Sequence, residues 1–274
     1  MMPITDSGRL LSMSTFEAAF VLRRFRRLNP TYSDEQLVES IRSVRSDFYP
    51  NDYEAGLALE KIVSPEHDGT IDVVFFRAAI ESHITHHNPL WVRFVTGGRE
   101  HVLRAVEVNG TQCFRNAGLL DAPPSDETSK WWDELAAQVR RDREITLMDQ
   151  ARRAERLSLE FERARLRSLG IQKEPRWVSI EDNSAGYDIL SYDPGNIEPT
   201  NRLIEVKSST HRPPRIFITR SEWEAAKTFG SSYVFQIWQL PDATLVQRTV
   251  AEMERHIPAD NGLGWWTDVQ ITFR

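Results

Sequence analysis

Apolar residues recur at helical spacing through the first half of the chain. Four segments show this pattern, each bounded by a capping residue or by a proline-containing turn: residues 14–28, 33–48, 54–63 and 72–87. The S-x-x-E spacing from Ser14 to Glu17 is typical of a capping box, as is Ser33 with Gln36. The pattern from Leu90 to Leu120 is mixed, so its secondary structure stays open. These segments predict a mainly helical domain over residues 1–125.

A proline pair at Pro123-Pro124 interrupts the chain and marks a boundary. From about residue 127 to residue 169 there is neither Pro nor Gly, and apolar residues again follow helical spacing. This stretch forms one long helix or two. We therefore expect a connecting helix over residues 126–155, followed by a second domain over residues 156–274.

Short apolar segments separated by turn residues predict strands in the second domain. They cover residues 177–180, 187–191, 203–207, 216–218 and 233–240. Thr219 and Glu222 have capping-box spacing and begin a helix that ends at Gly230. The order is helix, three strands, a short strand, helix and a final strand of the central sheet. That order predicts an α/β layer architecture with an αβββαβ core.

Three charged residues lie on two of these strands. Because alternate side chains of a strand point to opposite faces, Glu205 and Lys207 share one face of their strand. Asp188 is a single acid in the short apolar segment before it, and Gly186 permits a tight turn there. If the two strands are neighbours, the carboxylates of Asp188 and Glu205 converge.

Two carboxylates and an amine at this spacing suit phosphodiester hydrolysis. Carboxylate oxygens bind Mg²⁺, which completes its shell with water and phosphate oxygens and lowers the pKa of a bound water. Lys207 would stabilise the negative charge that develops on phosphorus and orient the attacking water. A solvated strand with a charged face is the alternative for so short a motif.

The long helix offers a further carboxylate. Leu157, Phe161 and Ala164 lie along one side, which we predict to be buried, and Glu160 belongs to that side whereas Glu162 points away. A buried glutamate needs a partner, so Glu160 is a candidate third ligand of the same metal ion. An ion pair between Glu160 and a neighbouring arginine of the helix is the alternative.

Positive charge is concentrated near the start of the second domain. Residues 151–176 contain eight basic and four acidic side chains, whereas the whole chain has a net charge of -6. A basic helix face can release counterions from a nucleic acid. We predict nucleic-acid contacts at Arg163, Arg167 and Ser208; for the arginines, a solvated helix face is the alternative.

Other features limit the classes of function. Cys113 is the only cysteine, so neither an intrachain disulfide nor a cysteine-based zinc cluster is possible. His83 and His87 stand one helical turn apart; a metal site there needs a third ligand, and a polar helix end is the alternative. No apolar run is long enough to span a bilayer, and the start of the chain lacks a signal-peptide pattern. We therefore expect a cytoplasmic protein without membrane contact.

Four segments together resemble a known family. They are Arg-Trp-Val-Ser, Gly-Tyr-Asp-Ile-Leu-Ser, Ile-Glu-Val-Lys-Ser-Ser and Ile-Thr-Arg-Ser-Glu-Trp-Glu-Ala-Ala. In this order and at these spacings they resemble the PD-(D/E)XK nuclease superfamily over about residues 156–240. The resemblance is to the branch found at the C-terminus of the plant protein NO VEIN and in bacterial proteins near restriction and defence genes.

This resemblance implies a restriction-endonuclease-like fold and Mg²⁺-dependent hydrolysis of DNA, with Mn²⁺ as a possible substitute. Asp188 and Glu205 fall on the family's metal-binding acids, Lys207 on its lysine and Glu160 on the glutamate of its first helix. Tyr187 replaces the proline that gives the superfamily its name, a departure common in this branch.

The expected function is that of a DNA endonuclease that acts in defence against foreign DNA. The alternative is a catalytically inactive subunit that uses the same fold to bind nucleic acid or protein. Besides DNA, the expected partners are a second copy of the chain and a partner ATPase or helicase. Residues 1–125 match no family that we can name, so target selection, dimerisation and partner binding all stay open for them.

Overall fold

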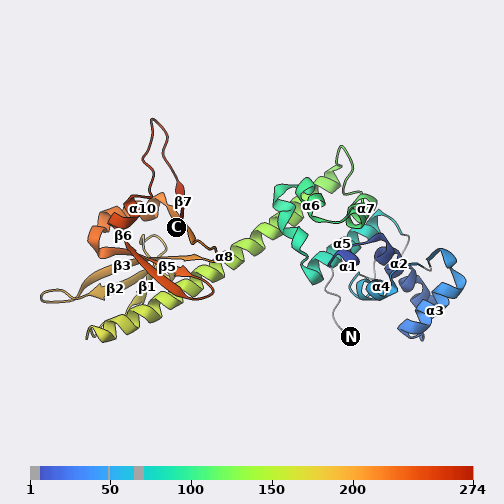
Figure 1. Cartoon of the computed structure of the whole chain (residues 1–274), viewed down its shortest axis with the longest axis horizontal. Helices are drawn as coiled ribbons and strands as arrows, with labels where there is room; N and C mark the ends of the chain where they lie inside the picture. Colours follow the sequence, from blue (N-terminus) through green and yellow to red (C-terminus); the bar gives the residue numbers. More distant parts are fainter. Residues whose placement is uncertain (1–6, 49, 65–70, 274) are drawn as a thin grey trace. The chain divides into compact units, whose positions relative to one another are not determined.

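The computed structural model describes the chain except for residues 1–6, 49, 65–70 and 274. It divides into two compact units, residues 1–143 and residues 144–274 (Figure 1). The helix α8, Asp126–Ser168, is continuous across the division between the units. The stretch free of proline and glycine therefore forms one helix rather than two.

The first unit contains only helices in its described part. Besides the first part of α8 these are α1 Ser7–Leu10, α2 Met13–Leu28, α3 Asp34–Val44, η1 Ser46–Phe48, α4 Tyr53–Glu60, α5 Val73–His87, η3 Leu90–Gly97, α6 Arg99–Ala105 and α7 Val108–Asn116. The prediction of a mainly helical N-terminal region is confirmed. The segment of mixed pattern from Leu90 to Leu120 is helical as well, since it contains η3, α6 and α7.

Capping side chains begin several of these helices. Ser33 and Gln36 form the predicted capping box of α3. The box predicted at Ser14 is wrong, because Ser12 caps α2 and accepts a hydrogen bond from the backbone N of Thr15. The Ser14 hydroxyl instead accepts from the backbone N of Asp52 at 2.8 Å, which ties α2 to the start of α4.

The core of the first unit depends on close helix contacts. A side chain on Gly56 of α4 would bring its Cβ to 2.5 Å from Cβ of Ala18 on α2, so glycine allows these helices to touch.

Within the described part of the chain, no helix has the length and apolar character needed to cross a membrane.

The second unit contains a five-stranded sheet in the order β1-β2-β3-β5-β6. Its strands are β1 Arg176–Trp177, β2 Ile189–Asp193, β3 Thr200–Ser209, β5 Tyr233–Gln239 and β6 Thr244–Thr249. The central strands β3 and β5 are parallel, and the other neighbours are antiparallel. The remaining elements are α9 Val178–Glu181, β4 Arg215–Thr219, α10 Arg220–Phe229, η4 Gly230–Ser232, α11 Val250–Glu254 and β7 Asp268–Thr272.

The α/β class is confirmed, although three strands differ from the prediction. The strand predicted at residues 177–180 ends at Trp177 and continues as α9. β4 leaves the main sheet and pairs with β7 in a separate two-stranded ribbon. β5 is an inner strand rather than the last one, because β6 follows it. The pairing of β4 with β7 joins segments far apart in the chain, which local patterns do not reveal.

Two helical layers cover the five-stranded sheet (Figure 1). Ile204 and Val206 of β3 pack with Leu159 of α8 on one face. Leu203 of the same strand packs with Trp223 of α10 on the opposite face. The alternation along β3 thus separates an α8 face from an α10 face of the sheet.

A buried ionic cluster joins α8 to the sheet. Glu162 is fully buried, and its Oε2 accepts hydrogen bonds from Arg165 Nε and Ser191 Oγ, both at 2.7 Å. Its Oε1 accepts from Gln236 Nε2 at 2.7 Å. Arg165 also donates to Asp193 Oδ1 at 2.7 Å. Both carboxylate oxygens of Glu162 are therefore satisfied by groups from α8, β2 and β5.

Replacing Glu162 by alanine should destabilise the second unit by about 3–5 kcal/mol, since the change leaves buried partners without their anion. Glu160→Ala is the matched control, because Glu160 is exposed on the same helix. It should change the free energy of unfolding by about 0.5 kcal/mol or less. Urea denaturation measures both changes, and hydrogen exchange should assign the loss to residues 144–274. Equal stabilities of the two variants would contradict a structural role for Glu162.

Candidate active site

The pairing of β2 with β3 brings two acids together. Ile189 lies opposite Ile204 in an antiparallel register, and the backbone N of Asp188 donates to the carbonyl of Ile204 at 2.9 Å. Asp188 therefore stands opposite Glu205 at the start of β2. Since facing residues in a ladder share a side of the sheet, both carboxylates lie on the α10 face.

A tight turn precedes Asp188. Gly186 has a φ of 79°, in the left-handed region, and a Cβ there would lie 2.8 Å from Cβ of Ala225 on α10. Glycine therefore allows the chain to pass close to α10 before β2 begins. The backbone carbonyl of Asp188 accepts from the amides of Val178 and Ser179, at 2.8 and 3.1 Å, and these bonds fix the start of the strand.

The Asp188 carboxylate is held on one side only. Its Oδ2 accepts from the backbone N of Val206 at 2.7 Å. Its Oδ1 accepts no hydrogen bond from the residues that the structure describes. Burial raises the pKa of Asp188 to about 6; the Val206 bond opposes this shift and the charge of Glu155 adds to it. The site thus holds an acid with one oxygen open to a ligand.

Glu205 is 4% exposed and has a partner at each oxygen. Its Oε1 lies 2.8 Å from Nζ of Lys207, and its Oε2 lies 3.1 Å from the hydroxyl of Tyr233. Burial raises the pKa of Glu205 to about 8; Lys207 opposes the shift, whereas Asp188 adds to it.

The Tyr233 hydroxyl connects Glu205 to the turn. It also lies 2.8 Å from the carbonyl of Gly186. Its single proton is therefore shared between the carbonyl of Gly186 and Oε2 of Glu205, and the hydroxyl links the turn to the carboxylate. Burial raises the pKa of Tyr233 above its ordinary value, and the phenol therefore stays neutral.

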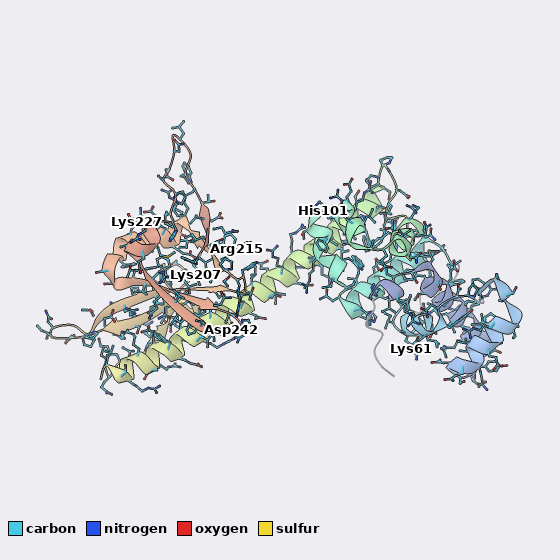
Figure 2. The ribbon with its side chains drawn as sticks, viewed as in Figure 1. Lys61, His101, Lys207, Arg215, Lys227 and Asp242 are labelled. Atoms are coloured by element: carbon cyan, nitrogen blue, oxygen red, sulfur yellow. The ribbon has the colours of Figure 1, made fainter. Side chains whose placement is uncertain are left out.

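Lys207, labelled in Figure 2, is half-buried in the second unit and lies between two carboxylates. Its Nζ is 2.8 Å from Oε1 of Glu205 and 2.8 Å from Oε2 of Glu222. Burial alone lowers the pKa of Lys207, but the two anions outweigh burial and raise it above the ordinary value. The amine is therefore a permanent cation at neutral pH.

Glu222 also belongs to the first turn of α10. Its Oε2 accepts from the backbone N of Thr219 at 2.9 Å, and its own backbone N donates to Thr219 Oγ1 at 3.3 Å. This is the predicted capping box. The sequence shows the cap but not that the same carboxylate reaches Lys207, because the lysine is on another element.

The predicted orientation of Glu160 is wrong. Glu160 is exposed, whereas Glu155 and Glu162 are buried on the side of α8 that faces the sheet. The prediction took only apolar residues as signs of the buried side of the helix. Polar residues can be buried as well, and then the apolar pattern points to the wrong side. Ala164, which was assigned to that side, is exposed. Here two of the buried positions are glutamates with hydrogen-bond partners supplied by the sheet.

Glu155 is the carboxylate of α8 whose charge contributes to the raised pKa of Asp188. Its Oε2 accepts from Arg152 Nη1 at 2.8 Å, from Ser179 Oγ at 2.7 Å and from Trp177 Nε1. Sequence reasoning missed Glu155. Its spacing of seven residues from Glu162 places both on one helix face, but the apolar pattern assigns Glu162 to the exposed side, so the sequence gives no signal for Glu155.

Two of the predicted nucleic-acid contacts lie further along α8. Arg163 is exposed and pairs with Glu174, with 3.4 Å between Nε and Oε2. Arg167 is exposed as well. At 1.5 Å per residue they stand roughly 12 and 18 Å along the helix from Glu155. The structure therefore does not group these arginines with Asp188 and Glu205.

Ser208 lies on the opposite side of the sheet from Lys207. Its neighbours Ile204 and Val206 face α8, and the Ser208 hydroxyl accepts from Gln150 Nε2 of that helix at 3.0 Å. Strand alternation explains the separation, because adjacent residues point to opposite faces. Ser208 is thus a contact of α8 rather than a part of the site around Glu205.

The arrangement of acidic side chains decides whether a divalent metal ion could bind at this site. In the described part of the chain, no group of three His, Cys, Asp or Glu side chains is arranged to hold a metal. The predicted convergence of Glu160 with Asp188 and Glu205 is therefore wrong, and His83 with His87 does not gain a third ligand. Two carboxylates do converge, and Mg²⁺ is commonly bound through one or two carboxylates while keeping several waters. Asp188 and Glu205 fit that ion by their chemistry.

Without divalent ions, the second unit should lose stability as the pH rises from about 4 to 8. Both acids have folded-state pKa values above their ordinary ones, about 6 and about 8, so the folded state binds protons more tightly than the unfolded state. Their contribution is fully present below the ordinary values and disappears as the pH passes the raised ones. Thermal unfolding of wild type and Glu205→Gln, at pH 5 and pH 8, measures this.

Glu205→Gln should lose about 3–4 kcal/mol less stability than wild type between these pH values, since the amide does not titrate. Mg²⁺ should stabilise wild type more at pH 8 than at pH 5, because the ion binds the deprotonated acids. If the stabilities of wild type and Glu205→Gln change equally between pH 5 and pH 8, the burial of these acids does not control the pH dependence of stability.

The comparisons with known proteins concern this second unit. No curated protein and no solved structure matches the chain. Residues 154–249 match the family described as Protein NO VEIN, C-terminal, and this range contains Asp188, Glu205, Lys207 and Glu222. The predicted resemblance to the NO VEIN C-terminal branch is therefore confirmed over residues 154–249.

Proposed function

We propose that this protein is a divalent-metal-dependent endonuclease that hydrolyses phosphodiester bonds in DNA. The observation that carries the proposal is the grouping of Asp188, Glu205 and Lys207 on one face of the sheet, with 2.8 Å between the lysine amine and Glu205. Acids with strongly raised pKa values beside a fixed cation are typical of catalytic sites. The family match and the resemblance to PD-(D/E)XK nucleases support the same reaction.

Asp188 and Glu205 would hold the metal ion. A bound Mg²⁺ would polarise a phosphate oxygen and lower the pKa of a coordinated water. Oδ1 of Asp188 is the oxygen left open for it, because Oδ2 is occupied by the Val206 amide. Binding requires both acids to be deprotonated, so their raised pKa values make the site sensitive to pH.

Lys207 would stabilise the transition state. Its charge is fixed in place by Glu205 and Glu222, so it needs no reorganisation when negative charge develops on the phosphate. Glu222 acts here as a positioning residue. Glu155 has a similar supporting role, because it bonds Ser179, whose amide binds the carbonyl of Asp188.

A role in defence against foreign DNA is the biological setting that the resemblance suggests. One site cuts one strand, so a second copy of the chain would be needed to cut both strands at once. A partner ATPase or helicase would be the other way to supply the substrate. The helical unit of residues 1–143 is the part available for dimerisation or for such a partner.

A second candidate function is DNA or protein binding without cleavage. The observation that favours it is that two acids, rather than three, converge in the described part of the chain. In addition, Lys207 already occupies one oxygen of Glu205. A domain with such a site would bind DNA or protein as a catalytically inactive subunit of a larger defence complex.

Plasmid cleavage distinguishes the two functions. Purified wild type should nick supercoiled plasmid in Mg²⁺ or Mn²⁺ and should be inactive in EDTA. Asp188→Asn and Lys207→Ala should each lower the rate by at least about 100-fold, the usual effect of removing a charged group from a hydrolytic site. A wild type that cuts neither DNA nor RNA but retards its migration in a gel would support binding without cleavage.

The two glutamates of α8 provide a matched pair for the same assay. Glu155→Gln should slow cleavage by about tenfold, because it weakens the hydrogen bonds behind Asp188. Glu160→Gln should cleave like wild type, since that side chain is exposed. Loss of activity in Glu160→Gln with normal activity in Glu155→Gln would reverse our assignment of the helix carboxylate.

A further inference from the structure

The ribbon of β4 and β7 exposes one face that the proposed chemistry does not use. Burial alternates along β4, so that Ile216 and Ile218 enter the core while Arg215 and Phe217 face outwards. Phe217 is 53% exposed and lies opposite Gln270 of β7. An aromatic ring flanked by an arginine and an amide is therefore presented on a two-stranded ribbon.

The chain before β7 adds two more apolar side chains at a turn. Gly264 N donates to the carbonyl of Asn261 at 3.2 Å, and Gly262 has a φ of 60°. Next to these residues Leu263 is 100% exposed and Trp265 is 71% exposed. In Figure 1 this segment, drawn in dark red before β7, extends away from the sheet.

The base of this turn is fixed to the core. Arg220 donates to both oxygens of Asp260, at 2.6 and 2.7 Å, and its guanidinium lies 5.4 Å from the ring centre of Trp266. The backbone N of Arg220 also donates to the carbonyl of Thr267 at 2.8 Å. The two exposed apolar side chains are thus carried on a segment that is anchored at both ends.

The anchor is also next to the candidate active site. Arg220 is the first residue of α10, and Glu222, two residues further, holds Lys207. β4 ends at Thr219, whose backbone N donates to Glu222. The ribbon and the turn are thus joined to the helix turn that holds Lys207.

The chemistry of this surface favours nucleobases. Aromatic rings stack on every base, whereas paired bases in a duplex hide their faces. Arg215 forms no ion pair with any residue that the structure describes and is exposed, so it can meet a phosphate. Of the acids near the turn, Asp260 is paired with Arg220, whereas Asp268 keeps its charge and accepts a hydrogen bond from the hydroxyl of Thr267.

We propose that Phe217, Leu263 and Trp265 form a stacking surface for unpaired nucleobases, so that the substrate is single-stranded or locally opened DNA. This inference rests on the proposed nuclease function, because it takes nucleic acid as the ligand of the neighbouring site. Phe217 supplies a stacking platform on the ribbon, and Leu263 with Trp265 supplies an apolar wedge at its tip. Arg215, beyond Phe217 on the same face of β4 and further from the turn, contacts the backbone that continues past the platform.

The test is a binding measurement in EDTA with the full chain. Fluorescence anisotropy would compare a single-stranded 30-mer, the same sequence as a duplex, and a duplex with a central unpaired bubble. Trp265→Ala and Phe217→Ala should each weaken single-strand and bubble binding by about tenfold and duplex binding by less than about threefold. Ile197→Ala is the matched control, because Ile197 is 96% exposed in the loop between β2 and β3. It should bind like wild type.

Wild-type affinity of both variants for the single strand would overturn the proposal, as would an equal loss on duplex and single strand. Unchanged thermal unfolding of the variants excludes misfolding as the cause of a loss. Because no metal is present, the result does not depend on cleavage. Ribbon-dependent binding by a protein that never cleaves DNA would refute the nuclease function alone, whereas cleavage with unaffected ribbon variants would refute the stacking surface alone.

Discussion

The ammonium group of Lys207, held between the carboxylates of Glu205 and Glu222, is the contact on which the second unit depends. It joins β3 to the first turn of α10 across the interior of the unit. Without this cation, Asp188, Glu205 and Glu222 would leave three acids close together with little solvent to separate their charges. One buried amine therefore permits acids to be grouped where burial alone would make them costly.

Two clusters of acids on this sheet differ in whether a carboxylate oxygen is open to a ligand. Glu162, on the α8 face, is fully buried and accepts three hydrogen bonds from protein groups, so its carboxylate is shielded from a ligand. Asp188, on the α10 face, is bonded through Oδ2 only and has a pKa raised to about 6. A satisfied buried carboxylate stabilises packing, whereas a carboxylate with an open oxygen is prepared to bind a cation.

The helix α10 links the site to the outer surface of the unit. Its first turn contains both Glu222, which binds Lys207, and Arg220, which anchors the segment before β7. The same short region thus positions the charged groups and the exposed apolar turn with Trp265. A nucleic acid that contacted both regions would meet charged side chains at Lys207 and exposed apolar side chains at the turn.

The sequence by itself determined the features that depend on local geometry. Strand alternation placed Glu205 beside Lys207, and capping-box spacing located the start of α10. Only the tertiary structure decided which glutamate of α8 faces the sheet and that β4 pairs with β7. Glu160 carries the same charge as the buried Glu162, and no local pattern separates them. The partners that make burial of Glu162 favourable come from β2 and β5, so the choice depends on contacts between residues far apart in the chain.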